Sequence, residues 1–288
     1  MDVVRNYRRV YGLGDEVGQA QVDQHRELEG RLTRDILTSS RSNRWQVVSD
    51  AYTQLYAACP WLNKGDAVPP ESWFAIWRRL IPNQSRVYEV GSGNAHLLNH
   101  LVAQGHDCVA TEITKERGQK FLSSSERLAW HQSDGVNLVD FEPAAHYDVV
   151  ISTQVIEHFH PDDVATHLSN VCKILKPGGR YIFDTPHRST GPHDLSRVFD
   201  LDAPQFMHLK EYTFLELRDQ AKAAGFRKVR AVFRVKSIVT ASSIYLAWLC
   251  AVDRIESRFV HSQVQRRLLR QLLRALLVPS GIWLVAER

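Results

Sequence analysis

Residues 86–95 read RVYEVGSGNA, and this stretch decides the fold. Its apolar first half is typical of a short buried strand, and a helix is expected from about Ala95 to Gln104. Glycine suits the bend between them because the backbone there has to turn tightly and approach a ligand without a Cβ in the way. A single GxG is weak evidence of a ligand loop, so the surrounding pattern has to decide its meaning.

Short apolar runs continue along the chain after this bend. They read DCVATEI (107–113), LAWHQSD (128–134), YDVVIST (147–153) and RYIFDTP (180–186). Helices are expected between them, one from Lys115 and one from Asp162 to Leu175. Strands and helices that alternate at this spacing predict βαβ units, and hence an α/β fold with a Rossmann-like, doubly wound, mostly parallel sheet.

The rest of the chain divides into a helical region before the sheet and a mixed region after it. We expect residues 1–80 to form a helical N-terminal cap, with helices at 20–37, 43–56 and 71–80, and residues 81–288 to form the main domain. Within that domain, FRKVRAVFRV (226–235) is typical of a strand, a helical insertion is expected at about 240–277, and IWLVAE (282–287) is expected to be the last strand.

The composition is that of an ordinary globular protein. The 288 residues are 44% hydrophobic and 24% charged, which excludes a disordered or fibrous chain. The four cysteines lie far apart without a CxxC pair, so neither a disulfide framework nor a zinc ribbon is expected. Since there is no signal-peptide pattern and no apolar run long enough to span a membrane, we expect a cytoplasmic protein.

Three acidic residues stand where successive strands end. Glu89 lies in the first strand before the glycines, Glu112 ends the second strand, and Asp134 ends the third. The carboxyl ends of parallel strands meet at one edge of a sheet, where such folds bind ligands, and an acid at Glu112 is placed to accept hydrogen bonds from a ribose diol. The sequence therefore predicts a nucleoside-containing cofactor at this edge.

Two cofactors compete for this edge, a nicotinamide dinucleotide and S-adenosylmethionine. A pyrophosphate needs a third small residue in GxGxxG, where this chain has His96, and the charge of Glu89 would repel it. S-adenosylmethionine has no phosphate and carries an ammonium and a sulfonium, which suit an acidic neighbour. The charges therefore favour S-adenosylmethionine over NAD.

From about Arg86 to Arg288 the chain resembles a class I S-adenosylmethionine-dependent methyltransferase. EVGSGNA resembles the family's glycine-rich motif, TEI its ribose-binding acid and SDGV its adenine-binding acid. YDVVISTQVIEHF and ILKPGGRYIFDTP resemble the branch that includes the ubiquinone-biosynthesis O-methyltransferases. This resemblance implies seven strands, with the last one antiparallel between the fifth and the sixth.

The resemblance also implies roles for single residues. The expected cofactor-binding residues are Glu89, Gly91, Ser92, Gly93, Glu112, Ile113, Asp134, Gly135, Val136 and Gln154. Among them it assigns Glu89 and the glycines to the methionine moiety, Glu112 to the ribose hydroxyls and residues 134–136 to the adenine. Gln154 would lie near the sulfonium.

Methyl transfer to a hydroxyl requires the acceptor to lose its proton, so a base is useful. We expect His158, directly after the fourth strand, to be this base, with Glu157 as its orienter and His193 as a further catalytic candidate. The alternative is that Glu157 and His158 cap the helix that starts near Pro161. In the quinone-type relatives this segment can hold a divalent cation, but Gln154 stands where that pattern often has Glu, so no metal is expected.

The loop after the fifth strand is dense in groups able to bind a polar acceptor. The candidate substrate residues are His187, Arg188, Asp194 and Arg197. One alternative is that the loop histidines only form hydrogen bonds. Another is that they bind a metal, for which no third ligand falls at a suitable spacing.

The C-terminal part of the chain is basic, with 12 Lys or Arg and 3 Asp or Glu in residues 227–288. VQRRLLRQLLRALL (264–277) places Val264, Leu268, Leu272 and Leu276 on one helical stripe, with the arginines toward other faces. Such a helix could contact an anionic membrane surface, form a homodimer contact, or pack on the core with its arginines outside.

Taken together, these patterns predict a cytoplasmic S-adenosylmethionine-dependent methyltransferase that acts on a small molecule, at a hydroxyl oxygen rather than at nitrogen. The alternatives are methylation of a small molecule at nitrogen, methylation of RNA or protein, an NAD-dependent oxidoreductase, and a non-catalytic binding scaffold. No DNA partner is expected. The acceptor depends on the shape enclosed by residues 1–80, the 185–210 loop and the 240–277 insertion.

Overall fold

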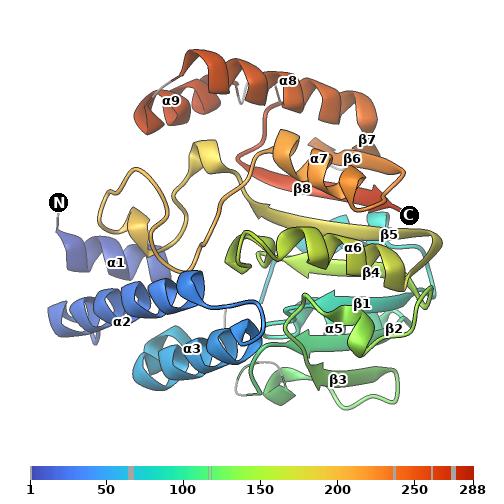
Figure 1. Cartoon of the computed structure of the whole chain (residues 1–288), viewed down its shortest axis with the longest axis horizontal. Coiled ribbons are helices and arrows are strands. Elements are labelled where there is room, and N and C mark those ends of the chain that lie inside the picture. Colours follow the sequence, from blue (N-terminus) through green and yellow to red (C-terminus); the bar gives the residue numbers. More distant parts are fainter. Residues whose placement is uncertain are drawn as a thin grey trace.

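The computed structural model describes residues 2–63, 68–115, 117, 119–235, 238–260, 262–273 and 277–288. In these ranges the chain forms an eight-stranded sheet with helices on both faces and a group of N-terminal helices beyond one end of the strands (Figure 1). The helices are α1 (Val3–Tyr11), α2 (Gln19–Thr38), α3 (Arg44–Ala58), α4 (Glu71–Leu80), α5 (His96–Ala103), α6 (Val164–Ile174), α7 (Phe214–Ala223), α8 (Ser243–Phe259) and α9 (Gln263–Leu273).

The sheet has the order β3-β2-β1-β4-β5-β8-β6-β7. Its strands are β1 (Arg86–Val90), β2 (Asp107–Glu112), β3 (Leu128–Gln132), β4 (Tyr147–Thr153), β5 (Leu175–Pro186), β6 (Lys228–Val235), β7 (Ile238–Ser242) and β8 (Gly281–Glu287). Strands β1 to β5 pair in parallel, and β8 lies antiparallel between β5 and β6. The doubly wound sheet and the position of the last strand are thus confirmed.

Three elements differ from the expectation. The sheet has one strand more than seven, because Ile238–Ser242 pairs antiparallel with β6 before the helical insertion begins. Its β-branched residues favour a strand over a helix. The described residues after Lys115 form a short 3-10 turn, Gln119–Phe121, instead of an α-helix. Helix α1 was not expected, because a short amphipathic pattern of nine residues is weak evidence for a helix.

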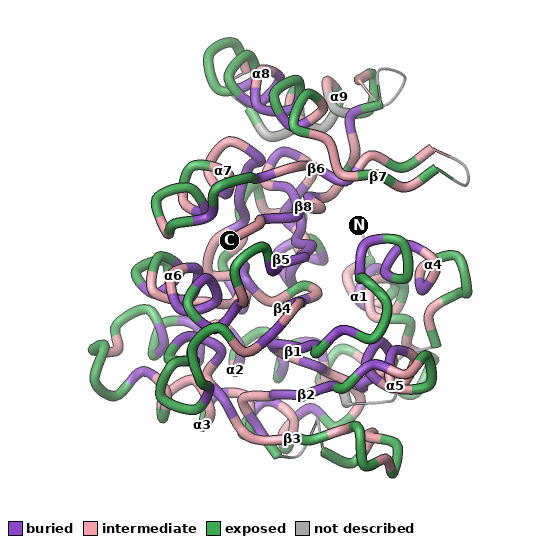
Figure 2. The backbone as a smooth tube through the Cα atoms, turned by 90° about the vertical axis from the view of Figure 1, so that its right-hand side faces the viewer, coloured by how far each residue is buried: buried purple, intermediate pink, exposed green. Residues whose placement is uncertain are grey.

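Two hydrophobic clusters lie on opposite faces of the sheet. Tyr88 and Val90 of β1 pack in the cluster that contains residues of α6, α7 and α8. Val87 of the same strand packs in the other cluster, with residues of α4 and α5. Because successive side chains of a strand point to opposite faces, the strand buries apolar groups on both sides, and Figure 2 shows the central strands largely buried.

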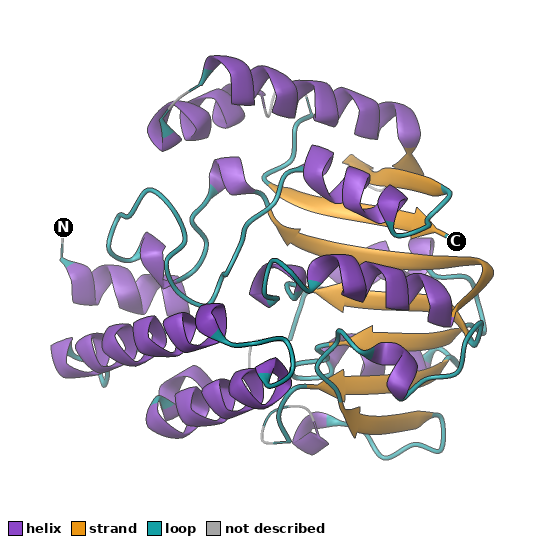
Figure 3. Cartoon of the chain, in the orientation of Figure 1, coloured by secondary structure: helices purple, strands orange, loops and turns teal. Residues whose placement is uncertain are grey.

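The N-terminal helices α1, α2 and α3 lie at the end of the sheet toward which β1, β2 and β4 point (Figure 3). Tyr7 and Val22 pack there with Leu195, Val198 and Phe206 of the long loop after β5. A second cluster joins α2 and α3 to Met207 of the same loop. These contacts place α3 opposite the carboxyl ends of the parallel strands.

Candidate functional site

A cavity of about 740 Å³ lies between the carboxyl ends of β1 to β4 and helix α3. We call it the first cavity. It is lined by every residue of the expected cofactor-binding set: Glu89, Gly91, Ser92, Gly93, Glu112, Ile113, Asp134, Gly135, Val136 and Gln154. The structure therefore brings together ten residues that are spread over more than sixty positions of the sequence.

The bend after β1 depends on glycine at one position above all. Gly91 has φ +67°, and a Cβ there would lie 2.7 Å from Cγ2 of Val155. Gly93 also has a positive φ of +53°, but a Cβ on it would meet no atom within 4 Å. Gly91 is therefore required by its backbone and its packing, whereas Gly93 faces open space.

Glu89 is a buried carboxyl at the floor of the first cavity. Its side chain is 2% exposed, and Oε2 has no hydrogen-bond partner among the described residues. Burial raises the pKa of Glu89 well above its ordinary value, and the neighbouring carboxyls of Glu112 and Asp184 raise it further. A cation bound beside it would offset this cost, because an opposite charge favours the ionised carboxylate.

Glu112 and Asp134 are engaged by nearby backbone. Glu112 accepts from the N–H of Gly93 at 2.8 Å and from that of Ile113 at 3.0 Å. Asp134 Oδ1 accepts from the N–H of Val136 at 2.8 Å and of Asn137 at 2.9 Å. These bonds hold both carboxyls at the rim of the cavity. Each oxygen of Glu112 and Oδ2 of Asp134 can still accept from a further donor.

Helix α3 forms the opposite wall of the first cavity. Val48, Tyr52 and Tyr56, spaced four residues apart and hence on one face of the helix, all line it. The hydroxyl of Tyr56 accepts a hydrogen bond of 2.6 Å from Arg117, in the loop after β2. The expectation that residues 1–80 help to shape the site is consistent with this wall.

His158 lies in the 3-10 turn Ile156–His158 after β4 and lines the first cavity. Its Nδ1 is 2.9 Å from the carbonyl oxygen of Met207 and 3.0 Å from the hydroxyl of Tyr52. A carbonyl can only accept, so Nδ1 carries the proton and Nε2 the lone pair. Burial, with the nearby His208, lowers the pKa of His158 to about 3, so the ring is neutral.

Glu157 points away from the first cavity into the protein. It is fully buried, Oε2 accepts from the Thr185 hydroxyl at 2.9 Å, and Oε1 has no partner among the described residues. Burial raises the pKa of Glu157 to about 7. The carbonyl of Met207, not Glu157, therefore orients the His158 ring. The capping alternative is wrong, because the residue before α6 is Asp163, and Glu157 and His158 form hydrogen bonds with Thr185 and Met207 instead.

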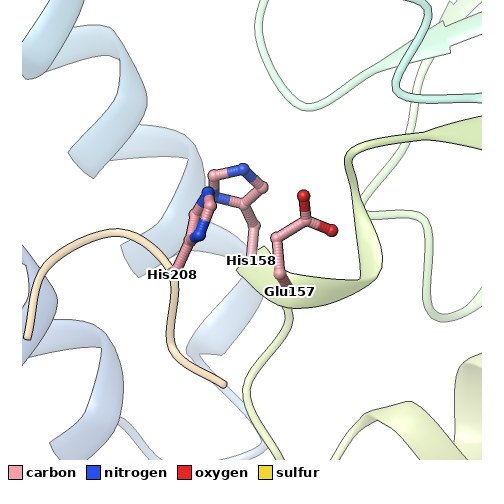
Figure 4. Close-up of side chains that lie close together, drawn as sticks. All are labelled: Glu157, His158 and His208. Atoms are coloured by element: carbon pink, nitrogen blue, oxygen red, sulfur yellow. The ribbon is translucent and has the colours of Figure 1, made fainter. Parts of the chain in front are cut away.

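Figure 4 shows His158 between Glu157 and His208. Each of the three residues offers a ligand atom, and these atoms lie within 4.8 Å of one another. His208 comes from the loop before α7, fifty residues after His158. The two rings contact edge to face, with their centroids 4.8 Å apart. This cluster has the donor atoms to hold a divalent cation.

A second cavity of about 690 Å³ adjoins the first, and Gln154 lines both. The second cavity lies beside the ends of β5 and β8 and is also lined by Asp184, His193, His208 and Tyr245. Asp184 Oδ2 accepts from the Gln154 amide at 2.6 Å, while its buried Oδ1 has no partner among the described residues. Burial raises the pKa of Asp184 to about 7.

Glu211 holds the two histidines of the second cavity. It accepts from the backbone N–H of His193 at 2.7 Å, and its carboxylate lies 3.2 Å from His193 Nδ1 and 3.0 Å from His208 Nδ1. Burial alone would raise the pKa of Glu211, but these bonds lower it to about 2. Burial alone would likewise lower the pKa of His208, but Glu211 and the neighbouring carboxyls raise it.

The structure does not bring the four expected substrate residues to either cavity. His187 is fully buried and bonds Asp253 of α8 at 3.1 Å. Arg188 bonds Glu216 of α7 at 3.2 Å. Asp194 accepts from the N–H groups of Ser196 and Phe206, so it shapes its own loop, and Arg197 is exposed. The alternative of loop histidines that only form hydrogen bonds is consistent with the contacts of His187.

Sequence reasoning missed Asp184, His208, Glu211 and Tyr52. A signal existed for Asp184, a lone acid at the end of the apolar strand RYIFDTP. The other three follow no motif or spacing, because they reach the site from a loop and a helix whose position only the packing decides.

A family model described as "Methyltransferase domain" matches residues 68–231, more than half of the chain. Over 169 residues the chain is 28% identical to a malonyl-[acyl-carrier protein] O-methyltransferase of Methylococcus capsulatus, a match that covers 56% of this chain and 58% of that protein. Over 108 residues it is 30% identical to a ubiquinone biosynthesis O-methyltransferase of Aliivibrio fischeri, covering 36% and 45%. The chain thus spans about half the length of these curated relatives.

Among solved structures, the fold is similar to that of 1,6-didemethyltoxoflavin-N1-methyltransferase of Burkholderia thailandensis. The TM-score is 0.52 at 15% identity, and the match covers 87% of this chain and 91% of that one. At this identity the likeness concerns the fold alone.

Proposed function

This chain belongs to the methyltransferase domain family, and on that premise we propose that it transfers the methyl group of S-adenosylmethionine to a hydroxyl oxygen of a small molecule. The observation that carries the proposal is the buried oxygen of Glu89 beside the glycine bend, which has no hydrogen-bond partner in the described part of the chain. A carboxyl in this place suits a cationic ligand and repels a pyrophosphate.

The residues of the first cavity fit the donor. Glu89 and the bend at Gly91 and Gly93 accommodate the methionine end, Glu112 accepts from the ribose, and Asp134 with the following backbone meets the adenine. When bound, S-adenosylmethionine supplies a methyl group activated by a positively charged sulfur. The chain's part is to align that donor with the acceptor and to keep water away.

The second cavity is the proposed acceptor site. It meets the first cavity at Gln154, which is where the resemblance puts the sulfonium, so an acceptor lying there is close to the donor. Its polar lining and a neighbouring apolar wall that includes Trp283 and Tyr245 suit a hydroxylated ring or chain.

Two residues compete for the role of proton acceptor. His158 is a neutral ring whose Nε2 carries the lone pair, but its pKa of about 3 makes it a weak base. Asp184 has one oxygen without a partner among the residues that the structure describes, lines the acceptor cavity and has a pKa of about 7. Since a base works best when its pKa is near the working pH, we assign the proton to Asp184 and a positioning role to His158, which would align the donor for the transfer.

Oxygen is the proposed target because both curated relatives are named O-methyltransferases. The structural relative is named for methylation at nitrogen, but its identity to this chain is too low for that to bear on the acceptor.

Calorimetry and a product assay test the proposal. S-adenosylmethionine should bind and NAD should not, and hydroxylated small molecules should give S-adenosylhomocysteine in a coupled assay. His158→Ala should lower turnover far more than donor affinity. Tight NAD binding without a response to the methyl donor would overturn the assignment, and full activity of His158→Ala would remove that residue from the mechanism.

A further inference from the structure

One side of α8 exposes a stripe of large apolar side chains. Ile244, Trp248, Ile255 and Phe259 follow one another at helical spacing, and Ile244 and Phe259 are 85% and 70% exposed. The opposite side of the helix, with Leu246, Leu249 and Val252, is buried in the core. We call the exposed stripe the outer face of α8. A contiguous apolar face of this kind on a protein surface usually marks a contact site.

The charges around this face are positive. Residues 243–277 contain six arginines and two acids, Asp253 and Glu256. Both acids are buried: Asp253 bonds His187 and the N–H of Leu215, and Glu256 accepts from Ser189 at 2.7 Å. Arg254 and Arg258 are exposed and, at helical spacing, flank the outer face.

Helix α9 lies next to α8 and also exposes apolar side chains. In both views it lies beside α8, away from the N-terminal helices (Figures 1 and 2). Leu268 and Leu272, one helical turn apart, are 56% and 74% exposed, so these two residues of the expected stripe are not packed on the core. Leu276, the last residue of that stripe, and the neighbouring Arg274 lie outside the described residues. No helix in the described ranges is long and apolar enough to cross a bilayer.

We propose that the outer face of α8, together with α9, docks on the surface of an anionic lipid bilayer. A lipid surface suits both the exposed apolar side chains and the arginines beside them. The apolar side chains would enter the boundary between headgroups and acyl chains, and the arginines would contact anionic headgroups. In a dimer through this face, the arginines of the two copies would lie close together and repel each other. RNA would pair with the arginines but would not bury the isoleucines and Phe259. The proposal does not depend on methyl transfer.

The docking face also adjoins the second cavity. Tyr245, in the first turn of α8, donates from its hydroxyl to the carbonyl of Leu277, and both residues line that cavity. A bilayer held against α8 would therefore lie near the cavity's rim, where an acceptor dissolved in lipid could enter.

Vesicle binding tests the proposal directly. The full chain is sedimented with vesicles of phosphatidylcholine alone or of equal parts phosphatidylcholine and phosphatidylglycerol, at rising ionic strength. We expect binding to the anionic vesicles only, weakened by salt, with a blue shift of tryptophan emission that Trp248→Phe removes. Each arginine near the surface contributes about fivefold to partitioning. The pair Arg254→Gln and Arg258→Gln should therefore lower it on the order of twentyfold, and Phe259→Ser should lower it as well.

Matched variants elsewhere on the surface serve as controls. Arg31→Gln with Arg79→Gln removes the same charge from exposed sites on α2 and α4, and Phe141→Ser removes an exposed aromatic ring, so these proteins should bind as the parent does. Equal binding to both vesicle types, or binding that the α8 variants leave unchanged, would overturn the proposal. So would dimerisation or RNA binding through this face without vesicle binding, because the face would then belong to that partner.

Discussion

Gln154 holds Asp184 through two hydrogen bonds. Its backbone N–H donates to the Asp184 carbonyl at 3.0 Å, and its side-chain amide donates to the carboxylate at 2.6 Å. Gln154 adopts the left-handed conformation, φ 54°, which non-glycine residues rarely do. Such backbone is retained where the surroundings over-determine it, as at ligand sites. The pair fixes one oxygen of Asp184, while the other has no partner among the described residues and belongs to a carboxyl that lines the second cavity.

Asp184→Asn should lower kcat on the order of 100-fold or more, since general bases contribute about that much. In the parent, kcat/KM should rise with pH through about 7 as Asp184 loses its proton, and then level off. A pH profile of both proteins checks this. Asp140→Asn, an exposed acid near the same sheet, is the control.

A second readout separates a base from a merely structural acid. The Gln154 hydrogen bond lowers the pKa of Asp184, so Gln154→Leu should move the midpoint of the profile to higher pH. A profile that keeps its midpoint in this variant, or persists in Asp184→Asn, would show that another group titrates.

Glu89→Gln should weaken binding of S-adenosylmethionine by about 10- to 100-fold, as expected for a hydrogen bond to a charged group. The same change should stabilise the ligand-free protein near pH 8, because the pKa of Glu89 is raised and its ionised form is costly to bury. Calorimetry and denaturant unfolding measure the two effects. Glu126→Gln, an exposed acid, should change neither, and undiminished donor affinity in Glu89→Gln would contradict its role.

Gly91→Ala should destabilise the fold more than Gly178→Ala. Both glycines have positive φ, +67° and +79°, which costs an alanine about 1–2 kcal/mol. Only at Gly91 does the added Cβ also meet a side chain, Val155 at 2.7 Å. Thermal unfolding of both variants, and of Gly91→Ala combined with Val155→Ala, measures the difference. If the double variant recovers nothing, the contact with Val155 is not the cause.

Glu211→Gln should lower the free energy of unfolding by about 3 kcal/mol at neutral pH, because it leaves His193 and His208 without their buried carboxylate. The pKa of Glu211 is lowered to about 2, so its contribution is complete above about 4.3, the ordinary value of a glutamate, and is lost as pH falls toward 2. Denaturant unfolding between these limits should show the two proteins converge in acid. If the two proteins still differ in unfolding free energy at low pH, the effect of the substitution comes from packing and not from charge.

Removal of divalent cations should leave turnover unchanged, as the sequence predicts a reaction without metal. Dialysis against a chelator, followed by assay with and without added Mg²⁺ or Zn²⁺, checks this. If activity were lost and restored by one ion, Glu157, His158 and His208 would be the ligands to replace first.

The sequence by itself determined the sheet and one wall of the site. The alternation of apolar runs specifies βαβ units, and parallel strands necessarily bring Glu89, Glu112 and Asp134 to the same edge, so local pattern and topology were enough. The substrate loop could not be predicted in this way. His187 and Asp194 have the right chemistry, but whether they face a cavity or the core depends on what packs against them.

The tertiary structure alone decided the acceptor side. Tyr52, His208 and Glu211 reach the strand ends from segments far away in the sequence, and no periodicity records that approach. It also decided which groups titrate near neutrality, because the pKa values of Asp184 and Glu157 are set by burial. Local residue patterns determine the secondary structure, whereas burial and the contacts between distant loops arise only when the whole chain packs.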